Sequence, residues 1–138
     1  MAGGSRPSTP GSSRQLIGLQ GAYYVATGAW AIVHRRSFEA VTGRKTDYWL
    51  VRTVGLLAAA IGASLLVAAT REERPSPEAV ALAGGSAASF ALVDVVYVWR
   101  RRISPIYLAD AALHALLAAL ALAARPGSRG RALPGAMA

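Results

Sequence analysis

The sequence contains no cysteine and little charge of either sign. The absence of cysteine excludes disulfide bonds, thiol chemistry and cysteine-ligated metals. Acidic residues are scarce, with 7 Asp and Glu against 15 Lys and Arg. Charged residues make up 16% of the 138 residues, whereas hydrophobic residues make up 54%. This composition is atypical of a soluble domain of this length, whose outer surface would need more polar side chains.

Four apolar segments are each about as long as the roughly 20 residues that a helix needs to cross a bilayer. They are apolar on all faces and not along one stripe, which is typical of membrane helices. The sequence therefore predicts an all-α fold, a four-helix transmembrane bundle. A soluble four-helix protein with an alanine-rich core is the alternative, and the lack of polar faces disfavours it. The predicted helices cover residues 16–36, 48–70, 77–100 and 105–124.

The segments between these helices predict how the bundle is connected. The last loop, "RRRIS", is so short that the third and fourth helices must form an antiparallel hairpin, and we expect a second hairpin from the first two. Residues 1–15 and 125–138 are rich in Gly, Ser and Pro, and we expect disordered tails there, outside a transmembrane domain of residues 16–124. The first apolar segment could be a signal peptide, but its length and the basic residues after it favour a retained helix.

The net charge of +8 comes from arginines that stand beside the apolar segments. Arginines in such positions favour contact with anionic lipid headgroups over nucleic-acid binding. We expect a multi-pass protein of the bacterial inner membrane, with a protein partner or a second copy of the chain as further partners. The residues expected to contact headgroups are Arg35, Arg36, Arg100, Arg101 and Arg102.

Two aspartates lie well inside the third and fourth apolar segments. Asp94 is six residues before Arg100, and Asp110 is six residues after Ser104. At 1.5 Å per residue, both carboxylates lie about 9 Å inside the same membrane edge, on neighbouring helices. An ionised aspartate that faces lipid costs about 2.5 to 3.5 kcal/mol, so both must be paired, neutralised or open to water.

Helical spacing and topology place further polar residues at the same membrane depth as the two aspartates. Tyr107 and His114 share a face with Asp110, and Tyr97 is three residues from Asp94. Arg52 lies at a similar depth, and its forked guanidinium could bridge two carboxylates. The predicted buried polar cluster or ligand site consists of Asp94, Asp110, His114, Arg52, Tyr107, Tyr97 and His34.

The loop "HRRSFEAVTGRKTDYWLVRTVG", from His34 to Gly55, together with the length and the four-span layout, resembles small four-helix bacterial membrane proteins of the DoxX-like and neighbouring uncharacterised types. The resemblance covers the membrane core in outline. It implies redox or accessory-subunit roles, and no site residue is carried over from it.

Three functions remain open. The first is a non-enzymatic accessory or scaffold subunit in which the polar cluster fixes helix packing. The second is binding or transport of a small lipophilic or cationic ligand by Asp94, Asp110, His114 and Arg52, and the third is a membrane redox or lipid enzyme. No nucleophile motif or phosphate loop appears, so no catalytic residue is predicted. The spacing of Asp94, Asp110, His114 and His34 matches no strong metal motif, and the sequence identifies neither a metal nor a cofactor.

Overall fold

The computed structural model describes residues 10–71 and 74–123, and within these ranges all regular structure is helical. Three of the helices are long and apolar enough to cross a membrane, and the last is apolar but shorter. The prediction of an all-α fold is confirmed. The helices are α1 (Pro10–Val33), α2 (Arg35–Thr42), α3 (Tyr48–Arg71), α4 (Pro77–Trp99) and α5 (Tyr107–Ala123). Residues 1–9 and 124–138, where most of the predicted tails fall, lie outside the described residues.

Three helix boundaries differ from the predicted ones by more than one residue. α1 begins at Pro10, earlier than expected, since proline is well tolerated in a first helical turn. It ends at Val33, because His34 leaves the helical conformation and caps α2, accepting a hydrogen bond from the backbone N–H of Ser37. α5 begins at Tyr107 and not at residue 105, because the preceding residues form i to i+3 turns.

α2 lies between the first two long helices, in the segment predicted from the sequence as a loop. Its polar and apolar residues lie on separate faces, as in an interfacial helix. The ring of Phe38 packs edge-on against Trp30 of α1, with 5.4 Å between ring centroids. Trp30 Nε1 also donates to Ser37 Oγ at 2.7 Å, so α2 is fixed against the end of α1.

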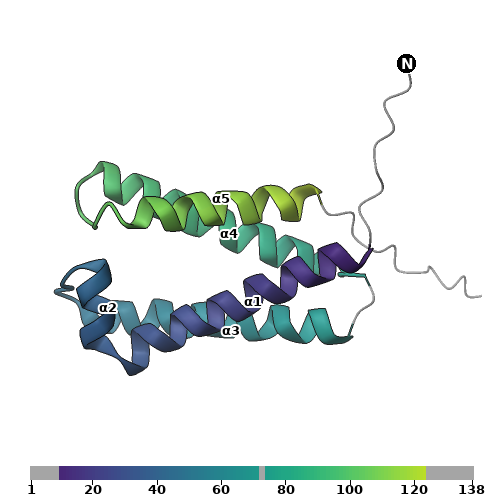
Figure 1. Ribbon diagram of the computed structural model, residues 1–138, viewed down its shortest axis with the longest axis horizontal. Helices are drawn as coiled ribbons and strands as arrows, with labels where there is room; N and C mark the ends of the chain where they lie inside the picture. Colours follow the sequence, from purple (N-terminus) through teal and green to yellow (C-terminus); the bar gives the residue numbers. More distant parts are fainter. Residues whose placement is uncertain (1–9, 72–73, 124–138) are drawn as a thin grey trace, which may run out of the picture.

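The long helices pack mainly as two pairs, α1 with α3 and α4 with α5. The two helices of each pair run in opposite directions, and α2 and the α4–α5 turn lie at the same end of the molecule (Figure 1). Contacts of α1 with α4 and α5, and of α3 with α4, join the pairs. A core cluster draws one buried residue from each long helix: Ile17, Leu65, Ala83 and Ala121.

Glycines let α1 and α3 approach each other closely. A Cβ atom added at Gly21 would lie 2.7 Å from the carbonyl oxygen of Gly62, and one added at Gly28 would collide with the carbonyl of Gly55. Backbones this close are typical of membrane helix pairs, where small residues replace the hydrophobic driving force with close packing. Gly21 and Gly28 are therefore the residues of α1 at the closest approach to α3.

The α4–α5 turn places arginine where helices usually have glycine. Arg101 has φ 55°, the left-handed conformation that commonly ends a helix. The N–H of Arg102 donates to the carbonyl of Tyr97, and the N–H of Arg101 to that of Val98, so this turn satisfies two carbonyls at the end of α4. The tight turn leads directly into the segment before α5, and α5 packs against α4.

The close α1–α3 contact predicts opposite effects for two glycine substitutions. Gly62→Ala would place a methyl group 2.6 Å from the Gly21 carbonyl oxygen, so we expect a loss of about 1 to 3 kcal/mol from overpacking. Gly85→Ala is the matched control, because nothing lies within 4 Å of its added Cβ, and should stabilise α4 by up to about 1 kcal/mol. Unfolding in mild detergent, followed by circular dichroism, measures both; equal effects would contradict the close contact.

Candidate functional site

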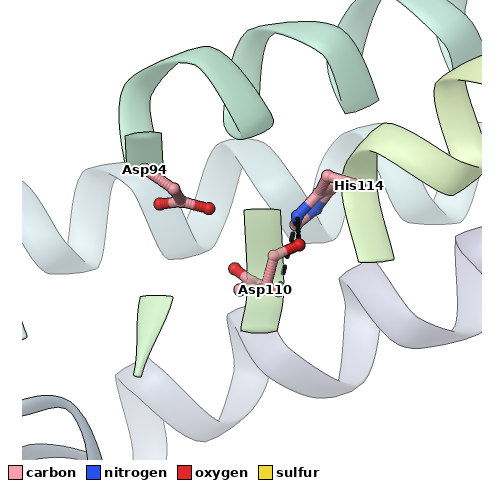
Figure 2. Close-up of side chains that lie close together, drawn as sticks. All are labelled: Asp94, Asp110 and His114. Carbon is pink, nitrogen blue, oxygen red and sulfur yellow. Dashed lines mark hydrogen bonds and ion pairs between the residues drawn. The ribbon is translucent and has the colours of Figure 1, made fainter. Parts of the chain in front are cut away.

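Asp94, Asp110 and His114 come together between α4 and α5. One oxygen or nitrogen atom from each of the three lies within 4.8 Å of the others. Figure 2 shows Asp94 extending from α4 toward α5, where Asp110 and His114 occupy successive turns. Asp94 and His114 are buried, and Asp110 is partly exposed. The two aspartates therefore lie close to each other, on neighbouring helices and at the matched depth inferred from the short loop.

The imidazole of His114 is held by Asp110 and by aromatic rings. Its Nδ1 lies 2.9 Å from the backbone carbonyl oxygen of Asp110 and 3.4 Å from the Oδ1 atom of the same residue. A carbonyl oxygen can only accept a hydrogen bond, so Nδ1 carries a proton in this arrangement. The rings of Tyr23, Tyr24 and Phe90 surround the imidazole, with centroid distances between 5.2 and 5.9 Å.

Tyr23 connects this group to α1. Its hydroxyl donates a hydrogen bond to Asp110 Oδ1, across the boundary between the two helix pairs. Tyr23 is not among the site residues predicted from the sequence. A hydroxyl on the first helix could be expected to reach the carboxylates, but only the order of the helices around the bundle shows which hydroxyl does so.

A second set of polar contacts lies next to the first. Gln20 Nε2 donates to the carbonyl oxygen of Ala83 on α4 at 2.8 Å and to the hydroxyl of Tyr24 at 3.2 Å. Ser86 Oγ lies 3.4 Å from the same hydroxyl. Gln20 and Tyr24 are both almost fully buried, so these bonds join α1 to α4 inside the protein.

One atom of the cluster lacks a partner. Asp94 Oδ2 is buried and accepts no hydrogen bond from the residues that the structure describes. Asp94 is only 6% exposed, so solvent reaches it poorly. A buried carboxylate oxygen without a partner is costly, and binding of a proton or a cation there would relieve that cost.

The structure does not bring four other predicted residues into the cluster. Arg52 is exposed on α3, and the expected ion pair with an aspartate does not occur among the described residues, because the face of α3 that meets α1 is set by Gly55 and Gly62. His34 is exposed and caps α2. Tyr97 is exposed on α4, near Arg100 and Arg102, where the three residues line an open hollow.

Tyr107, the fourth, contacts the α2–α3 loop instead. The Nζ atom of Lys45 lies 4.9 Å from the centre of its ring and donates to the carbonyl oxygen of Thr42 at 2.9 Å. Burial lowers the pKa of Lys45, although nearby Glu39 opposes the shift. The contact links the α1–α3 pair to the start of α5 at the end of the molecule that carries α2.

The arginines expected to contact lipid lie at this same end. Arg35 pairs with Glu39 at 3.2 Å and lies over the ring of Tyr48, 4.3 Å from its centre. The hydrogen bond from Arg35 lowers the pKa of Glu39, and a hydrogen bond from the backbone of Lys45 adds to the effect. Arg36, Arg100, Arg101 and Arg102 are exposed.

Fold and site together define an all-helical protein with three helices suited to crossing a membrane and a polar cluster between α4 and α5. Searches against known protein families, curated proteins and solved structures find no match to this chain. The resemblance to DoxX-like proteins therefore stays a prediction from size and layout.

Proposed function

We propose that the chain is a multi-pass integral membrane protein, a four-helix transmembrane bundle of two antiparallel hairpins, and that it serves as a non-enzymatic accessory or scaffold subunit. The proposal rests on one observation: the buried polar groups of α1 form hydrogen bonds with other helices of the same chain. Tyr23, Gln20 and Tyr24 of α1 bind groups of α4 and α5 in the same chain. Polar bonds of this kind fix the position of one helix against another in a membrane.

The distribution of charge and apolar surface supports a membrane location, for which we propose the bacterial inner membrane. Large apolar side chains are exposed along the long helices, including Leu56, Leu57 and Leu92. Exposed arginines gather at the end that carries α2 and the α4–α5 turn, where they would contact anionic headgroups. The exposed apolar faces would contact lipid, a protein partner or a second copy of the chain.

Binding of a small cation is a second candidate function, and the unpartnered Asp94 Oδ2 favours it. Asp94 and Asp110 bring two carboxylates together, and among the described residues neither one forms an ion pair with a lysine or arginine. Arg52 does not belong to this candidate site, because it is exposed on another helix.

The four-span layout predicts which positions face the same side of the membrane. The wild-type chain has no cysteine, so single substitutions Thr46→Cys, Arg74→Cys, Arg101→Cys and Ser128→Cys can be labelled without background. We expect an impermeant maleimide to label positions 46 and 101 from one side, and positions 74 and 128 from the other. Labelling of position 128 from the same side as position 101 would show that α5 does not cross.

An accessory role predicts a stable complex in the native membrane. We expect the tagged chain, gently solubilised, to migrate on native electrophoresis above the same chain purified alone. Copurification of two differently tagged copies would identify a homo-oligomer, and a distinct partner would appear as a second band after cross-linking. Migration of the native chain as a lone monomer under several mild detergents would contradict the accessory role.

A further inference from the structure

We propose that Asp94, Asp110 and His114 form a binding site for one divalent first-row metal ion of the Zn²⁺ type. The inference deepens the cation-binding function proposed above and rests on it. The three side chains come from two adjacent helices, and each offers a ligand atom within 4.8 Å of the others. Two carboxylates and one imidazole are a donor set that suits such ions.

The distances need only a small adjustment. In tetrahedral zinc sites with bonds of about 2.1 Å, the ligand atoms lie about 3.4 Å apart. His114 Nδ1 and Asp110 Oδ1 are already 3.4 Å apart. The other separations are at most 4.8 Å, and among the described residues Asp94 Oδ2 has no hydrogen bond that a metal ion would break. To bind a metal ion through Nδ1, neutral His114 would shift the proton that it now donates to the Asp110 carbonyl from Nδ1 to Nε2.

Charge favours an ion at this position. The titratable groups around it are the two aspartates, His114 and the hydroxyls of Tyr23, Tyr24 and Tyr107. The described residues place neither a lysine nor an arginine within ion-pair distance of either carboxylate. A divalent cation would neutralise both carboxylates and satisfy Asp94 Oδ2 in one step.

The hydrogen bonds around the site resemble those that surround bound metal ions in proteins. Tyr23 donates to Asp110 Oδ1, and such outer hydrogen bonds orient a ligating carboxylate. Tyr23 is therefore a positioning residue. The Asp110 side chain is 29% exposed, so the described residues do not fully cover the site.

The test is a Zn²⁺ titration of the full chain in mild detergent, after treatment with EDTA and desalting, with Mg²⁺ and Na⁺ titrated separately. We expect one Zn²⁺ per chain, a higher melting temperature on binding, and weaker binding as the pH falls, because protons compete for the ligands. Asp94→Asn and His114→Gln should each lower Zn²⁺ affinity at least about tenfold, the lower end of the effect of losing even an outer partner.

Two exposed residues give matched controls. His34→Gln removes the other histidine, and Asp47→Asn removes an exposed carboxylate; neither should change Zn²⁺ affinity. Circular dichroism and gel filtration of each variant exclude unfolding as the cause of lost binding. Equal Zn²⁺ affinity in wild type and Asp94→Asn, or a loss only in His34→Gln, would overturn the inference. Stabilisation by Na⁺ but not by Zn²⁺ would overturn it and leave cation binding in place, whereas insensitivity to all three ions would contradict both.

Discussion

A carboxylate inside an apolar helical protein needs a hydrogen-bond donor, and Tyr23 of α1 supplies one to Asp110 of α5. This bond crosses between the two helix pairs, where it is joined by the bond from Gln20 to the carbonyl of Ala83. Within each pair, helix packing depends on other features: glycines in α1–α3 and a short turn in α4–α5. These polar bonds therefore add to the apolar core cluster of Ile17, Leu65, Ala83 and Ala121 in fixing one pair against the other.

The same constraint gives the cluster its chemical character. Because Arg52 is exposed, the negative charge of Asp94 and Asp110 must be balanced by a proton, by His114 or by a bound cation. Among the described residues, no hydrogen-bond donor reaches Asp94 Oδ2. Packing and cation binding are thus compatible: Tyr23 holds Asp110 in place, and Asp94 remains available.

Much of this arrangement could be predicted from the sequence. The apolar segments predict the long helices. The short loop and the helical spacing together predict that Asp94, Asp110 and His114 lie close to one another. The rotation of α3 could not be predicted, because it depends on glycine contacts with α1 in three dimensions, and this is why Arg52 was misplaced. Tyr23 was missed for a similar reason, since helical periodicity does not tell which helix faces α5.

The most informative measurement is a double-mutant cycle of Tyr23→Phe and Asp110→Ala, with unfolding free energies measured in mild detergent or bicelles. We expect a coupling energy of about 0.5 to 2 kcal/mol, in the range of interhelical hydrogen bonds in membranes. Tyr97→Phe, at an exposed tyrosine, supplies the control and should show no coupling to Asp110→Ala. Additive effects of Tyr23→Phe and Asp110→Ala would contradict the view that this bond docks the two helix pairs.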